Sequence, residues 1–251
     1  MQMKGTKFPS HTPSLTGIIK MKNKKVIVIS LGGSQIIHEN EINLKFLLEL
    51  KKVLVKHFKN YKFIVVCGGG SVARMYISAL QKIKVSEKLQ SFAGISATRA
   101  NARFMNYFFN SDIKEGIPHT MQEVKKISKN KDIMFCGALE YHHNQTSDST
   151  AAQIAVYFNC EFINLTNVAG LYDKNPLEHK NAKLIPEISW GDFHKVVSKI
   201  KFKPGQHFVL DQSAARIILN SKIKTYILGQ KLINLDNLLF GKKFKGTLIF
   251  G

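Results

Sequence analysis

The sequence predicts an α/β fold with an open, mostly parallel central sheet. Short apolar runs of the kind found in buried strands alternate with amphipathic helical stretches, which is the order a parallel sheet requires. Two of these runs end directly in glycine-rich turns, as strands do at the ligand-binding edge of such a sheet. No Pro- and Gly-rich linker divides the chain, so we expect one continuous sheet with two lobes.

The alternation assigns each element a place in the chain. The expected strands are 25–31, 63–67, 132–136, 161–165, 224–228 and 246–250, and the expected helices are 41–58, 71–82, 86–110, 148–158 and 232–240. Two further helices are marked by N-cap residues, one by Ser189 with Asp192 three positions later and one by Asp211 before a helix to Asn220. The helix at 41–58 carries its apolar stripe on Ile42, Phe46, Leu47, Leu50, Val53 and Leu54.

Two parts of the chain differ in composition. Residues 1–24 form a basic, Pro- and Ser-containing tail without apolar periodicity, and we expect it to be disordered, with Met21 as a plausible start. Residues 25–251 are expected to form a single domain, because the chain is long enough to bury one large core.

Composition narrows the class of protein. No apolar run reaches the roughly 18 residues that a membrane span needs, and the polar, basic N-terminus does not have the pattern of a signal peptide. Cys67, Cys136 and Cys160 are odd in number and far apart, which favours neither a disulfide framework nor a zinc site. We therefore expect a cytoplasmic protein without a membrane partner.

The formal net charge of +20 raises the question of nucleic-acid binding. Lysines are spread along the whole chain without an aromatic-interleaved stripe, which favours a solvated surface and no specific nucleic-acid partner. Only four of the 37 basic residues are arginines: Arg74, Arg99, Arg103 and Arg216. A chain that otherwise uses lysine is expected to keep arginine where a planar, bidentate donor is needed.

The glycine-rich turns are the strongest chemical signal. Gly32-Gly33-Ser34 and Gly68-Gly69-Gly70-Ser71 each follow a strand, and Arg74 lies one turn into the helix after the second. Bare backbone N–H groups, a helix N-terminus and an arginine together predict a phosphate cradle. Two tight turns without a ligand are the alternative. Neither turn is a Walker A loop, because no Gly-Lys-Ser or Gly-Lys-Thr follows.

Two polar segments give weaker signals than the glycine-rich turns. Thr146-Ser147-Asp148 begins a helix and could bind a phosphate, although Asp148 could equally be an ordinary N-cap. Thr166 and Asn167, with Tyr172 in the following loop, could hold a base and ribose or form an ordinary turn. The pair His142-His143 lies in a polar loop, where solvated side chains are more common than a metal site.

Taken together, these segments resemble the amino acid kinase family and, within it, the archaeal-type uridylate kinases. The resemblance runs from about Val26 to Ile249. Its most specific pieces are VISLGGS (28–34), VVCGGGSVARMYI (65–77), FAGISATRANARF (92–104), QTSDSTAA (145–152), NLTNVAGLYDKNP (164–176) and LDQSAARII (210–218).

The resemblance implies a fold, cofactors and a set of site residues. It implies a three-layer αβα sandwich, ATP and Mg²⁺ as cofactors, and commonly a hexamer. Asp148, Arg74 and Arg216 would form the transfer centre. The ATP site would be formed by Gly33, Ser34, Gly70, Arg74, Thr166, Asn167, Tyr172 and Asn175. The UMP site would be formed by Gly69, Ser91, Ala138, Thr146 and Ser147. Thr98, Arg99 and Asn101 would lie near the nucleotide or a subunit interface.

The chain also departs from the family pattern. Ser30 and Arg216 stand where many members have lysine, and Ser91 stands where an aspartate contacts UMP. Ala169 and Asn175 replace two acidic residues of the nucleotide loop. The implied reaction is transfer of a phosphoryl group from ATP to UMP, giving UDP and ADP. The alternatives are a non-catalytic oxyanion- or nucleotide-binding or metal-oxyanion storage protein on the same fold, and a kinase for another small phosphate or carboxylate.

Overall fold

The computed structural model describes residues 24–38, 41–111, 116–142, 145–176, 178–199 and 210–251. Residues 1–23 of the expected tail and His143 lie outside these ranges. Among the described residues, no helix combines the length and apolar character needed to cross a membrane.

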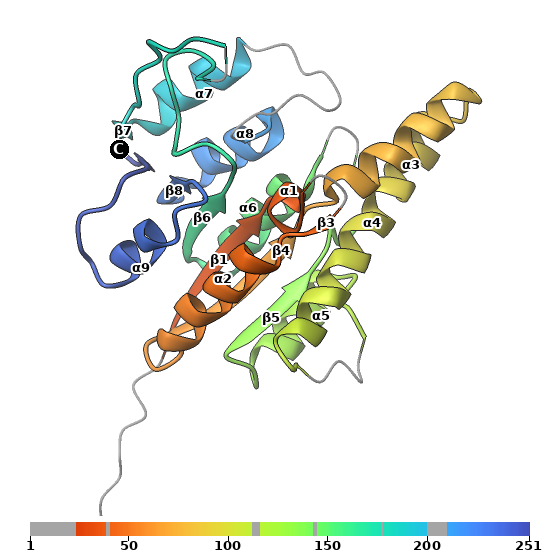
Figure 1. Cartoon of the computed structure of the whole chain (residues 1–251), viewed down its shortest axis with the longest axis horizontal. Coiled ribbons are helices and arrows are strands. Elements are labelled where there is room, and N and C mark those ends of the chain that lie inside the picture. The colour runs from red at the N-terminus through yellow and green to blue at the C-terminus, as the bar shows by residue number, and fades with distance from the viewer. Residues whose placement is uncertain (1–23, 39–40, 112–115, 143–144, 177, 200–209) are drawn as a thin grey trace, which may run out of the picture.

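A seven-stranded sheet forms the centre of the molecule (Figure 1). Its strand order is β5-β4-β1-β6-β8-β9-β7, and every neighbouring pair is parallel except β8 and β9. The strands are β1 Lys25–Leu31, β4 Tyr61–Cys67, β5 Ile133–Cys136, β6 Glu161–Leu165, β7 Glu187–Ile188, β8 Thr225–Leu228 and β9 Thr247–Ile249. A separate small hairpin joins β2 Ile37–His38 to β3 Glu41–Ile42.

Helices cover both faces of this sheet and give two separate cores. One core joins the sheet to α2 Leu44–Lys56, α4 Glu87–Phe108 and α9 Ile233–Leu239. The other joins it to α5 Met121–Ser128, α6 Ser147–Phe158, α7 Trp190–Ser198 and α8 Gln212–Ser221. Alternate residues of β1 enter opposite cores, Ile27 and Ile29 the first and Val28 the second, as the period of a strand dictates. The expected three-layer αβα sandwich is confirmed.

The remaining helices lie at the edge of the sheet where the strands end. α1 is a single turn, Gly33–Ile36, and α3 spans Gly70–Lys82. α3 has no buried residue, yet it packs along α4, and the pair extends beyond the sheet (Figure 1). This pair forms one wall of the site described below.

The structure differs from the sequence-based expectations in one helix boundary, one additional helix and the direction of the last strand. The helix expected at 41–58 begins at Leu44, because Glu41 and Ile42 pair with β2 and the Asn43 side chain caps the helix. Ile42 is therefore exposed and outside the apolar stripe. Helix α5 was not expected, although Thr120 and Glu123 form the capping box that announces it. The closing strand β9 reverses direction against β8.

Gln35 gives a stability test that is independent of function. Its side chain is 1% exposed, and neither amide atom has a hydrogen-bond partner among the described residues. An unsatisfied buried polar group costs about 1–3 kcal/mol. We expect Gln35→Met, of similar length, to raise the melting temperature, and Gln35→Glu to lower it. Thermal unfolding followed by circular dichroism measures both, and a destabilised Met variant would contradict the prediction.

Candidate active site

Five parallel strands end at one edge of the sheet, and this edge holds the site. β1, β4, β5, β6 and β8 run in the same direction and end in that order at Leu31, Cys67, Cys136, Leu165 and Leu228. Backbone bonds continue past these ends: Gly68 N–H donates to the Leu31 carbonyl at 2.8 Å, and Gly32 N–H donates to the Leu165 carbonyl at 3.2 Å. Ligands bind at this edge in open α/β sheets.

The two glycine turns are in direct backbone contact. A Cβ atom on Gly33 would lie 2.1 Å from the Gly70 nitrogen and 2.7 Å from the Gly68 carbonyl oxygen. Gly70 has φ of +60°, where side chains are rarely tolerated. The Asn101 side chain donates to the Gly68 carbonyl at 2.8 Å and fixes the second turn from α4. The close approach brings the start of α3 against the start of α1.

Asp148 lies in the first turn of α6, and its carboxylate accepts a hydrogen bond from a residue of strand β1. The Ser30 hydroxyl donates to Asp148 Oδ1 at 2.5 Å, although 118 residues separate the two in the chain. Ser30 is fully buried and Asp148 is half-buried. Burial, and then the neighbouring Asp211 carboxylate, raise the pKa of Asp148 to about 7, while the Ser30 hydrogen bond acts in the opposite direction.

Asp148 is not the N-cap of its helix. Thr146 occupies that position, and its hydroxyl oxygen accepts from the Asp148 N–H at 3.1 Å. The alternative that assigned Asp148 a plain capping role is therefore wrong. Its carboxylate is not used to start the helix.

Asp211 joins α8 to the beginning of α6. It caps α8 by accepting from the Ala214 N–H at 2.7 Å, as the sequence predicted. The same carboxylate accepts from the hydroxyls of Thr146 and Ser149. Asp211 is 6% exposed, and sequence reasoning identified it only as a cap. Because it bonds across helices, it sets where α8 and the predicted site residue Thr146 lie relative to each other.

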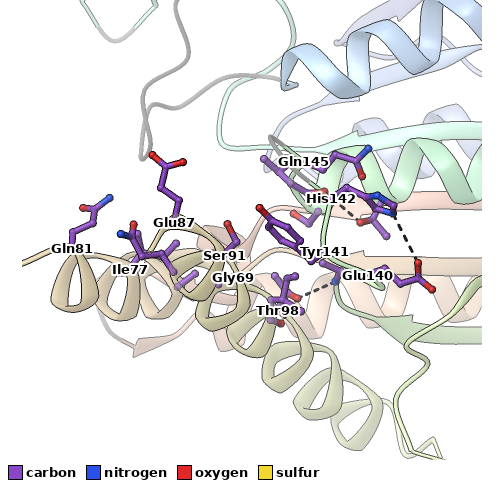
Figure 2. A pocket seen from close by; sticks show the side chains of 18 residues that line it. Gly69, Ile77, Gln81, Glu87, Ser91, Thr98, Glu140, Tyr141, His142 and Gln145 are labelled. Atoms are coloured by element: carbon purple, nitrogen blue, oxygen red, sulfur yellow. Dashed lines mark hydrogen bonds and ion pairs between the residues drawn. The ribbon is translucent and has the colours of Figure 1, made fainter. Parts of the chain in front are cut away.

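A cavity of about 540 Å³ opens beside these helix starts (Figure 2). This volume is within the range of small-molecule sites. All five residues expected to form the UMP site line the cavity: Gly69, Ser91, Ala138, Thr146 and Ser147. The other lining residues are Ala73, Ile77, Gln81, Glu87, Gln90, Gly94, Ile95, Thr98, Glu140, Tyr141, His142, Gln145 and Thr150.

The wall of the cavity after β5 is fixed by α4. Thr98 Oγ1 accepts from the Ala138 N–H at 2.9 Å and donates to the Ile95 carbonyl at 2.6 Å. Arg99 Nε donates to the Ala138 carbonyl at 3.1 Å, and its guanidinium also donates to the Leu139 carbonyl. The planar guanidinium of Arg99 thus donates to two neighbouring backbone carbonyls at once, and the ammonium group of a lysine could not reproduce this geometry.

The residues expected to bind ATP lie along the neighbouring strand ends. Gly33 and Gly70 meet at the turn contact, and Ser34 follows in α1. Thr166 follows β6, and its N–H donates to the Leu228 carbonyl at 2.9 Å. Their shared position at this edge agrees with a single ligand site, although the hydrogen bonds and contacts described above do not join them all.

Two further ATP candidates lie in the loop after β6. Tyr172 forms a β-bridge with Leu184, and Asn175 is exposed and donates to Glu178 Oε1 at 2.8 Å. Of the predicted transfer-centre arginines, Arg74 lies on α3 and Arg216 on α8, and both are exposed. Neither guanidinium is bonded to another described residue, so each is available to a ligand.

Comparison with known proteins agrees with this architecture. The model of the amino acid kinase family matches residues 25–229. The chain is 32% identical over 228 residues to the uridylate kinase of Thermococcus kodakarensis, which covers 89% of this chain and 98% of the relative. It is 35% identical over 203 residues to the uridylate kinase of Archaeoglobus fulgidus, covering 80% of this chain and 90% of the relative.

Solved structures give the same result. The crystal structure of uridylate kinase from Archaeoglobus fulgidus matches with a TM-score of 0.77 at 32% identity, covering 89% of this chain and 99% of that one. UMP kinase from Ureaplasma parvum matches with a TM-score of 0.71 at 20% identity, which supports the fold alone, over 92% of this chain and 100% of that one. Two of its relatives are the uridylate kinases of Thermococcus kodakarensis and Archaeoglobus fulgidus, and the chain therefore belongs to the amino acid kinase family.

Proposed function

We propose that the protein is a UMP kinase that transfers the γ-phosphoryl group of ATP to UMP, giving UDP and ADP. The observation that carries the proposal is the cavity beside the two glycine turns, lined by all five residues assigned to the acceptor. The similarity to uridylate kinases over most of the chain supports the same substrate.

The geometry suits an acceptor that carries a phosphate. The N-termini of α3 and α6 both meet the cavity, through Gly69 and through Thr146 and Ser147. Helix N-termini attract anions through free N–H groups and the helix dipole. The attacking phosphate oxygen is already ionised, so no general base is required. Catalysis then consists of positioning the two nucleotides and neutralising charge.

Each predicted transfer-centre residue would have a defined part in this process. Arg74, one turn into α3, would bind phosphate oxygens between the two nucleotides. Arg216 on α8 would supply a second guanidinium. Asp148, fixed by Ser30, would orient a cation or a basic side chain, because a carboxylate repels phosphate directly.

ATP is the expected phosphoryl donor, and the acidic residues at the site suit a hard cation such as Mg²⁺. The Asp148 carboxylate lies near that of Asp211, and neither is paired with a basic side chain among the described residues. Because Asp211 is occupied by two hydroxyls and a backbone N–H, Asp148 is the residue that would hold Mg²⁺ together with the phosphates of ATP. The ion would neutralise charge on the transferred phosphoryl group.

A homo-oligomer, by resemblance a hexamer, is part of the same proposal. It would cover large apolar side chains that α3 and α4 expose, namely Met75, Tyr76, Leu89 and Phe92. The proposed location is the cytoplasm, where both nucleotides are available.

The acceptor assignment is tested with the full chain and a panel of monophosphates. We expect ADP release with UMP in the presence of ATP and Mg²⁺, at a kcat/KM at least tenfold above that for CMP, AMP or GMP. A coupled assay measures turnover, and thermal shifts with each nucleotide report binding separately. Folded protein that prefers another acceptor, or that binds UMP without turnover, would overturn the proposal.

A further inference from the structure

The acceptor cavity has two chemically different parts. Near the glycine turn and the start of α6 it presents helix N-termini and hydroxyls, which suit a phosphate. Toward the connection between α3 and α4 it is lined by Gln81, Glu87, Gln90 and Ser91. None of the described lining residues is Lys or Arg, in a chain with 37 of them. This second part is suited to groups that donate hydrogen bonds and carry no negative charge.

Glu87 is the carboxylate that this second part offers. It lies in the first turn of α4, and Figure 2 shows it on the same side of the helix as Ser91, one turn later. It forms no ion pair with another described residue. The other lining carboxylate, Glu140, is exposed like Glu87, but it lies 4.0 Å from His142. Glu87 is therefore free to bind a ligand.

A carboxylate recognises hydrogen-bond donors, and a nucleoside monophosphate has two adjacent ones in its ribose hydroxyls. An ionised Glu accepts through two oxygens, which matches a pair of neighbouring hydroxyls. Acidic side chains bind ribose hydroxyls in this way in dinucleotide sites. The side-chain amides of Gln81 and Gln90, which both donate and accept, better match the mixed donors and acceptors of a base.

We propose that Glu87 binds the ribose hydroxyls of the acceptor nucleotide, so that the protein selects ribonucleotides over deoxyribonucleotides. This inference rests on the proposed function, because it assumes a nucleoside monophosphate in the cavity. Ser91 has a single hydroxyl group, so it adds one hydrogen bond to one ribose oxygen beside Glu87.

The test compares UMP with 2′-deoxy-UMP as acceptor for the wild-type protein and for Glu87→Gln. A hydrogen bond to a charged group is worth about tenfold or more in affinity. We expect the wild-type kcat/KM to favour UMP by about tenfold or more. Glu87→Gln should lower kcat/KM for UMP, through KM, by a larger factor than for 2′-deoxy-UMP, which keeps only the 3′-hydroxyl, and so reduce the preference to about twofold or less.

Two controls separate this role from a structural one. Glu49→Gln removes an exposed carboxylate on α2, outside the cavity lining, and should keep the wild-type preference. If Glu87 acted only through the helix dipole, Glu87→Gln would reduce both acceptors equally. Calorimetric binding of the two nucleotides gives a readout that does not need turnover.

The possible results distinguish the two proposals. UMP turnover with an unchanged preference in Glu87→Gln, or a wild-type protein that does not discriminate, would overturn the role of Glu87 alone. A protein that neither binds nor phosphorylates UMP would overturn the proposed function and this inference together.

Discussion

Asp148→Asn is expected to lower turnover by about 100- to 1000-fold, as losing a preorganised electrostatic group does. The amide keeps the shape of the side chain and can still accept the hydrogen bond from Ser30. Helix α6 keeps its N-cap, because Thr146 and not Asp148 supplies it. The loss therefore reports on the negative charge at the transfer centre. Turnover at saturating ATP and UMP measures it.

At high pH, and in the absence of Mg²⁺ and nucleotide, Asp148→Asn should raise the free energy of unfolding of the protein. The folded state raises the pKa of Asp148 from 3.8 to about 7, so it binds the proton more tightly than the unfolded state does. The free energy of unfolding contributed by this group falls as the pH rises between these two values. Asp148→Asn should melt at a higher temperature than the wild type at pH 8, with the difference shrinking toward pH 4. For the turnover prediction, an Asp148→Asn variant as active as the wild type would show that the Asp148 charge takes no part in catalysis.

Arg216→Ala is expected to reduce turnover by about 100- to 1000-fold with little change in fold. Helix α8 buries Ala214, Ala215 and Ile218, while Arg216 is exposed, so its removal leaves the helix packing intact. Asp211 fixes the start of α8 against α6 through Thr146 and Ser149. The helix that carries Arg216 is thereby joined to the element that carries Asp148.

Arg216→Lys should recover part of the rate, because it restores charge but not the planar fork. The matched control is Arg103→Ala, which removes another exposed arginine, on α4. The control should stay within about twofold of wild type, since a surface charge is worth little. A folded Arg216→Ala protein with turnover within about threefold of wild type would show that the transfer centre does not use Arg216.

Local patterns in the sequence determined most helices and strands. The apolar runs predicted β1, β4 and β6 to within two residues, because their side chains are buried on both faces of the sheet. The caps Ser189 and Asp211 were predicted from residue type alone and are observed, since a cap depends only on neighbours within one turn. The short elements β2, β3 and β7 were missed, because two-residue strands carry no readable period.

The tertiary structure alone decided how distant residues meet at the site. The bond from Ser30 to Asp148, the contact of Asp211 with Thr146 and Ser149, and the position of Glu87 in the cavity follow from the packing of separate elements. Periodicity and caps are local properties of a segment, so the sequence by itself determined the alternation of strands and helices and the glycine turns at the strand ends, while the three-layer arrangement was implied by the family resemblance. Strand order and helix packing depend on side chains far apart in the chain, and they alone determined the cavity and the raised pKa of Asp148.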